Sequence, residues 1–220
     1  MRGFASCSLQ LTMFGIHDFG VFLATGILLN VTPGPDTFYI LGRSMAQGRS
    51  AGIASVLGIS SGKIFHTLAA AFGLSALLLA SASAFLVVKF AGAAYLVYLG
   101  VRMLVTRTPA AAIPAGFSSS GFFAVYRQGL LTNVLNPKVA LFFLAFMPQF
   151  IGVDSPDKFA AFIALGLSFV TTGMLWCLWL AWFSSLLGDR LRGSNVFANI
   201  LNRVAGALFV TLGIRLATAK

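Results

Sequence analysis

Long apolar stretches separated by short groups of charged residues dominate the hydrophobic pattern of this chain. Six of them approach the ~20 apolar residues that a helix needs to cross a bilayer. They cover positions 19–41, 53–80, 85–105, 126–148, 159–187 and 203–219. The pattern therefore predicts an all-α integral membrane protein with about six transmembrane helices, the last of them close to the lower length limit.

Two parts of the sequence occur twice in the same order. Gly26-Ile-Leu-Leu-Asn-Val31 is similar to Gly129-Leu-Leu-Thr-Asn-Val134, and 103 positions separate the matching asparagines. Residues 91–102 are similar to residues 205–215, and 113 positions separate the matching arginines, Arg102 and Arg215. This spacing predicts a duplicated three-helix unit. Because three is an odd number of spans, the second copy enters the membrane from the opposite side, so the two repeats are inverted.

We expect these repeats to form one membrane domain. Residues 1–18 are an N-terminal extension, 19–105 the first repeat, 106–125 a cytoplasmic linker and 126–220 the second repeat. The linker is rich in Pro, Ala, Gly and Ser, which is typical of a flexible connection. Gly58 and Gly62 lie four apart among serines on the second span and favour close helix packing within the fold over a dimer contact.

The composition excludes a soluble globular domain. Hydrophobic residues make up 58% of the chain and charged residues 9%, too few for a soluble surface. The net charge of +10 does not indicate nucleic acid, because the arginines lie at the ends of the apolar segments. The positive-inside rule therefore places the loops after the first, third and fifth segments in the cytoplasm, and both termini outside it. We expect no cofactor, metal or nucleic acid.

The first apolar segment is interrupted by Pro33-Gly34-Pro35 directly before Asp36. Proline removes a backbone donor and glycine tolerates unusual conformations, so we expect the helix to unwind from Thr32 to Asp36. Unwound backbone is tolerated in a membrane only where protein covers it or where it lines a cavity. The positive end of the next half-helix suits the carboxylate of an amino acid, and Asp36 suits its ammonium group.

Asn136, Pro137 and Lys138 form the corresponding break in the second copy. A structural proline kink explains one such break, but not two at matching positions that are each followed by a charged residue. A charge at the bilayer centre costs at least ~2.5 kcal/mol on insertion scales, which makes Asp36 and Lys138 candidate functional residues. Two roles remain open for them, direct contact with a substrate and a structural ion pair.

Lys63 and His66 lie three positions apart on one face of the second span. A cation inside a span needs a partner, and Asp36 is the obvious one. His66 titrates near neutral pH and is either a proton shuttle or a packing residue. The candidate binding and coupling residues are therefore Asn30, Thr32, Pro33, Gly34, Pro35, Asp36, Lys63, His66, Asn133, Asn136, Pro137 and Lys138.

Four other classes of membrane protein compete with a transporter. A thiol–disulfide electron carrier needs equivalent cysteines in the two repeats, and Cys7 and Cys177 are not equivalent. A hydrolase needs a nucleophile with a base, and His66 with Asp36 makes no convincing set. A passive channel stays an alternative, and a structural membrane subunit leaves both proline breaks unexplained. The tryptophans at positions 176, 179 and 182 favour a lipid-facing or interfacial stripe over a substrate cage.

Four stretches carry a resemblance to a known family: Asn-Val-Thr-Pro-Gly-Pro-Asp at 30–36, Gly-Val-Arg at 100–102, Asn-Pro-Lys at 136–138 and Met-Pro-Gln-Phe at 147–150. Together they resemble the LysE/RhtB family of bacterial amino-acid exporters, of the homoserine/threonine/leucine efflux type, from about residue 13 to the C-terminus. The resemblance implies a multi-pass inner-membrane secondary transporter, not an enzyme, with both breaks as its signature. Many relatives have an acidic residue where this chain has Lys63.

The substrate expected from these residues is a neutral amino acid, such as threonine, homoserine or leucine. Apart from Asp18 near the edge, Asp36 is the only acid within the predicted spans, and a dibasic substrate needs more negative charge. We expect alternating access, in which the two repeats rock around a site built from the breaks, and proton antiport through competition at Asp36. The expected partners are the amino acid, protons and the lipid bilayer, with a homodimer as a further possibility.

Overall fold

The computed structural model describes residues 14–80, 82–105, 120–152 and 154–187, together with several residues between 203 and 218. Cys7, the N-terminal residues up to 13 and linker residues 106–119 lie outside this part. The described residues are helical apart from short connections and one isolated antiparallel bridge between Ile16 and Ile151. The predicted all-α architecture is thereby confirmed.

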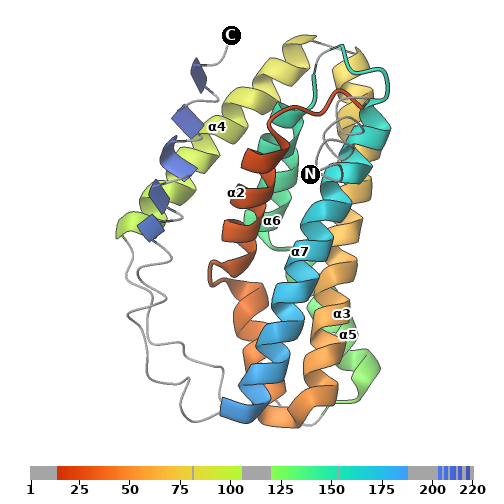
Figure 1. The fold of residues 1–220 in the computed structure, drawn as a ribbon, viewed down its shortest axis with the longest axis vertical. Coiled ribbons are helices and arrows are strands. Elements are labelled where there is room, and N and C mark those ends of the chain that lie inside the picture. Colours follow the sequence, from red (N-terminus) through yellow and green to blue (C-terminus); the bar gives the residue numbers. More distant parts are fainter. Residues whose placement is uncertain are drawn as a thin grey trace, which may run out of the picture.

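The elements, shown in Figure 1, are α2 (Phe19–Val31), α3 (Pro35–Ala80), α4 (Ala82–Val105), α5 (Phe122–Val134), α6 (Pro137–Leu141), the π-helical turn η1 (Phe142–Phe146), the 3₁₀ turn η2 (Met147–Phe150) and α7 (Lys158–Leu187).

Helices are broken where the sequence has its two proline motifs. α2 ends at Val31 before α3 begins at Pro35, and α5 ends at Val134 before α6 begins at Pro137. The hydroxyl and the N–H of Thr32 both donate to the carbonyl oxygen of Leu28, at 2.6 and 2.9 Å, and close the last turn of α2. The second break bends the helix by 48°. The prolines thus interrupt two helices, as the sequence predicts.

α3 is two helices joined at Gly48. This residue has φ 80° and ψ −169°, a conformation that glycine adopts without steric cost. Figure 1 shows the first part of α3 continuing away from α2 and the second part returning beside α5 and α7. The first apolar segment of the sequence therefore corresponds to α2 plus the first part of α3. α5 begins earlier than expected, at Phe122, because Gly121 is its extended N-cap residue.

Length and apolar character mark two stretches as able to cross a bilayer, Pro35–Leu74 and Lys158–Ser184. The bent pair Phe122–Val134 and Pro137–Phe150 would make a third span. Phe19–Val31 and Phe90–Val105 are shorter apolar helices. The chain is therefore an integral membrane protein, while the number of six spans and their inverted order stay predictions.

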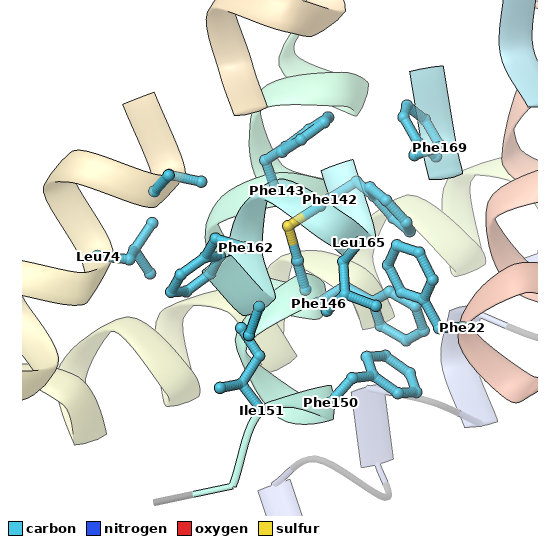
Figure 2. Close-up of a cluster of buried hydrophobic side chains, with 14 of the residues drawn as sticks. Phe22, Leu74, Phe142, Phe143, Phe146, Phe150, Ile151, Phe162, Leu165 and Phe169 are labelled. Atoms are coloured by element: carbon cyan, nitrogen blue, oxygen red, sulfur yellow. The ribbon is translucent and has the colours of Figure 1, made fainter. Parts of the chain in front are cut away.

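A cluster of buried aromatic and aliphatic side chains packs α2 against η1, η2 and α7 (Figure 2). The ring of Phe142 in η1 stacks on Phe169 of α7 with centroids 4.6 Å apart, and Phe22 of α2 meets Phe150 edge-on at 5.3 Å. Such contacts hold helices together in lipid mainly through shape complementarity and dispersion. A second cluster, which includes Ile40 and Ile59, packs both parts of α3 against α5 and α7. The polar residues of the breaks lie along the chain between these two clusters.

Glycines allow several helices to approach closely. A Cβ on Gly58 would overlap the carbonyl oxygen of Tyr126 in α5, so this glycine packs within the fold, as the sequence predicts. In the last segment, a Cβ on Gly206 would lie 2.7 Å from the carbonyl oxygen of Gly100 in α4. Gly100 and Gly206, two glycines of the second sequence echo, are thus in mutual contact, and they join the third element of one predicted repeat to that of the other.

Candidate functional site

The carboxylate of Asp36 is held by two asparagine side chains from the opposite break. Asn133 Nδ2 donates to Oδ2 at 2.7 Å, and Asn136 Nδ2 donates to Oδ1 at 3.0 Å. Asp36 lies in the first turn of α3, where the helix dipole also favours a negative charge. Asn133 lies at the end of α5 and Asn136 caps α6. The two breaks, about a hundred positions apart in sequence, therefore form one polar site.

Lys138 reaches from the second break to the first. Its Nζ donates to the carbonyl oxygen of Thr32 at 2.8 Å, beside the end of α2 where helix carbonyls lack helical partners. Its backbone N–H donates to Asn136 Oδ1 at 3.1 Å and starts α6. The cation thus lies at the negative end of the α2 dipole. The structural ion pair between Asp36 and Lys138, one of the two roles that the sequence leaves open, is not formed among the described residues.

Lys63, which is 2% exposed, pairs with α2 rather than with Asp36. Its Nζ donates to Asn30 Oδ1 at 2.8 Å and lies 5.4 Å from the centroid of the Phe169 ring. The amide of Asn30 continues to α7, because Nδ2 donates to Phe169 O at 3.3 Å and to Thr172 Oγ1 at 3.5 Å. The predicted Lys63–Asp36 pairing is wrong for this conformation, since an asparagine oxygen takes the place of the carboxylate.

Two glycines on the long helices make room for Asn30 and Asn133, the matching asparagines of the first sequence echo. A Cβ on Gly62 of α3 would lie 2.7 Å from the Cβ of Asn133, and a Cβ on Gly173 of α7 would lie 2.6 Å from Asn30 Oδ1. Both distances are too short for a real side-chain contact. Each break is therefore seated against a glycine of a helix from the other predicted repeat.

His66 lies one turn beyond Lys63 and behind the second break. Its Nε2 is 3.1 Å from the carbonyl oxygen of Asn133, and its ring stacks on Phe143 with centroids 5.8 Å apart. The side chain is buried, and it does not line the cavity described below. These contacts position the backbone that carries Asn133, while the role of His66 as a proton shuttle stays a prediction.

A small cavity of about 20 Å³ lies between the charged groups. It has room for about one water molecule. Seven of the candidate residues line it: Asn30, Thr32, Gly34, Asp36, Lys63, Asn136 and Lys138. The remaining candidates do not line the cavity. Pro33, Pro35 and Pro137 form the breaks, Asn133 donates to Asp36, and His66 contacts the backbone of Asn133.

Sequence reasoning missed five residues of the cavity wall: Leu29, Thr37, Val139, Phe169 and Cys177. Thr37 and Val139 are next to candidate residues, so proximity to the breaks indicated them. Phe169 and Cys177 lie on α7, and no motif connects this helix to the breaks. Cys177 is a free, buried thiol with 5% exposure.

Comparison with known proteins decides the family. The model of the LysE type translocator family matches residues 27–220, nearly the whole chain. The chain belongs to this family. It is therefore a membrane translocator, not an enzyme, and both helix breaks lie within the matched region.

Several relatives match almost end to end with this translocator. An uncharacterized membrane protein of Vibrio cholerae is 31% identical over 93% of this chain and 98% of its own length. The uncharacterized membrane protein YrhP of Bacillus subtilis is 27% identical over 91% of this chain. A leucine efflux protein of Salmonella choleraesuis is 26% identical over 94% of this chain and 98% of its own length. No solved structure matches the translocator.

Proposed function

We propose that this translocator exports neutral amino acids across the bacterial inner membrane as a multi-pass secondary transporter. The observation that carries the proposal is the set of charges around the cavity, where Asp36, Lys63 and Lys138 meet at two helix breaks. The similarity to leucine efflux proteins over nearly the full length supports amino-acid export and points to leucine or a similar side chain.

The charges match a zwitterion. One carboxylate and two ammonium groups line the cavity, so the site carries one more positive than negative charge. A zwitterion leaves this net charge unchanged, but each of its ends meets an opposite charge, because its carboxylate lies near Lys63 and Lys138 and its ammonium group faces Asp36. A lysine or arginine substrate would add a second positive charge with no acid left to receive it. The charge set therefore favours a neutral amino acid over a basic one.

The size of the cavity favours a carrier over an open pore. Space for about one water molecule does not admit an amino acid, so the helices around Asp36 must separate for binding. Alternating access supplies this step, with the two predicted repeats rocking around the breaks. The contacts that must be exchanged are those between Asp36 and the two asparagines and between Lys138 and Thr32.

Proton antiport follows from competition for the Asp36 carboxylate. Substrate binds the ionised form from the cytoplasm, and a proton from outside replaces it on the return. One charge moved through 100 mV provides about 2.3 kcal/mol, enough for a gradient of roughly fiftyfold.

The test is efflux from preloaded vesicles that contain the purified protein. Leucine, threonine, homoserine, lysine and arginine are the substrates. We expect saturable efflux of the neutral amino acids, loss of efflux in Asp36→Asn, and loss of uphill efflux when an uncoupler is added. Asp154→Asn, which removes an exposed acid of a connecting segment, is the matched control and should transport normally. Preference for lysine or arginine would contradict the substrate class, and uphill efflux that survives the uncoupler would contradict proton coupling.

A further inference from the structure

A groove lies beside the polar cavity, between α2 and α7. Its volume is about 380 Å³, against about 20 Å³ for the cavity. The apolar walls come from Ile27 and Val31 of α2 and from Leu175, Trp176 and Trp179 of α7. The rings of Trp176 and Trp179 are stacked, with centroids 5.0 Å apart and an interplanar angle of 16°. The tryptophan pair thus forms a flat apolar wall next to the charged site.

A single side chain, that of Asn30, lines both the groove and the cavity. On the cavity side its oxygen accepts a hydrogen bond from Lys63 at 2.8 Å. On the groove side its amide nitrogen makes two long hydrogen bonds, to Phe169 O at 3.3 Å and to Thr172 Oγ1 at 3.5 Å. Bonds of this length are weak, so little holds the amide between the two spaces.

We propose that this groove is the side-chain subsite of the transporter and holds the aliphatic side chain of a substrate as large as leucine. This inference rests on the proposed function. The charged ends of the amino acid need Asp36, Lys63 and Lys138, but the cavity between them has no room for a branched side chain. The adjoining groove supplies an apolar space of sufficient size, and rotation of Asn30 connects the two.

The groove favours a substrate over a lipid chain because its wall is not apolar throughout. Asn30 and Thr172 contribute an amide and a hydroxyl to it, 3.5 Å apart, and Ile27, Leu175 and the tryptophans line the rest. An acyl chain is apolar throughout and gains nothing from an amide and a hydroxyl. An amino acid has the matching polarity, with a charged backbone at one end and an apolar side chain at the other.

Filling the groove without touching the charged site tests the inference. Ile27, which is 43% exposed, lies one turn before Asn30, and Ile27→Trp narrows the groove. We expect the half-saturation concentration for leucine efflux to rise about tenfold while that for alanine changes less than about twofold. Leu167→Trp is the matched control, since Leu167 lies on α7 outside the groove wall and is 51% exposed. It should change neither value.

A second variant and a direct readout complete the test. Trp176→Ala widens the groove and should shift the preference between leucine and phenylalanine about tenfold towards phenylalanine. Leucine, but not alanine, should change the tryptophan fluorescence of the purified protein, and this change should disappear in Trp176→Ala.

Several results would contradict the proposal that the groove is the side-chain subsite. An unchanged ratio of leucine to alanine transport in both groove variants would do so while leaving export intact. Native mass spectrometry that finds a lipid lost only in Ile27→Trp, and never displaced by leucine, would assign the groove to lipid. If the wild-type protein exported no neutral amino acid at all, the proposed function would fail and the subsite with it.

Discussion

Two neutral amides stabilise Asp36, the single acid that lines the cavity. A hydrogen bond to a charged group contributes about 1.5–3 kcal/mol, roughly twice the contribution of one between neutral groups. Asn133 has no exposed surface, so water does not replace its donor when the side chain is removed. Amides carry no charge of their own, and they leave Asp36 able to exchange one partner for another during transport.

Replacing Asn133 by leucine should therefore weaken the whole site. We expect a loss of stability of about 1.5–3 kcal/mol and efflux near background, because Asp36 keeps only one side-chain donor. Thermal unfolding in detergent and vesicle efflux measure the two effects. In an Asp36→Asn background the same substitution should cost less, since the paired charge is already gone.

Thr132→Ala is the control for this prediction. Thr132 is half-buried and its hydroxyl donates to the carbonyl oxygen of Gln128 in its own helix, so stability and efflux should stay near the wild-type values. Equal losses in Thr132→Ala and Asn133→Leu would show that the effect comes from the end of α5 as a whole and not from the bond to Asp36.

The sequence could identify the residues of the site but not their pairing. Proline, glycine and intramembrane charge marked Asp36 and Lys138, because these features are unusual within an apolar segment. Spacing predicts neighbours only within one helix, so the sequence offers Lys63 no partner more obvious than Asp36, the acid within the predicted spans. The structure instead joins residues 97 and 100 positions apart, and such contacts depend on how the two breaks face each other.

At the level of elements, glycines determine how closely the long helices approach the breaks. Gly62 and Gly173 leave no space for a methyl group against the asparagines, whereas Gly73, also on α3, has nothing within 4 Å of its would-be Cβ. The breaks were predictable from proline, but the contribution of α7 was not, because a glycine on a long apolar helix gives no sign of which neighbour it meets.

Gly62→Ala and Gly73→Ala form a matched pair on one helix. The first should reduce efflux strongly, because its methyl group displaces Asn133 and with it one donor to Asp36. The second should leave efflux unchanged and stabilise the helix by up to about 1 kcal/mol. Efflux kinetics and thermal unfolding distinguish them, and a fully active Gly62→Ala protein would contradict the close packing described here.

For the molecule as a whole, the proposed cycle requires that the cavity open to both sides of the membrane. Cys177 lines the cavity and is buried, which makes it a reporter of opening. The chain has two cysteines, so Cys7→Ser leaves Cys177 as the single thiol.

In that variant a charged, membrane-impermeant thiol reagent should label Cys177 from either side of oriented vesicles. Saturating leucine on the same side should slow the labelling several-fold, and the Cys7→Ser, Cys177→Ser protein should show no labelling. Labelling from one side only would contradict alternating access. Labelling that leucine does not slow would show that Cys177 lies outside the substrate path.

The crosswise bonding of the two breaks also has a consequence for biosynthesis. Asp36 enters the membrane long before Asn133 is made, since 97 positions separate the two residues. At 5–20 residues per second, the ribosome needs roughly 5–20 s to synthesise that interval. During this time the nascent first half contains the Asp36 carboxylate, whose two asparagine partners do not yet exist, whereas Lys63 already has its partner Asn30. Completion of the site is therefore a late event in biogenesis, and the half-made protein depends on water, lipid headgroups or the insertion machinery to accommodate its charges.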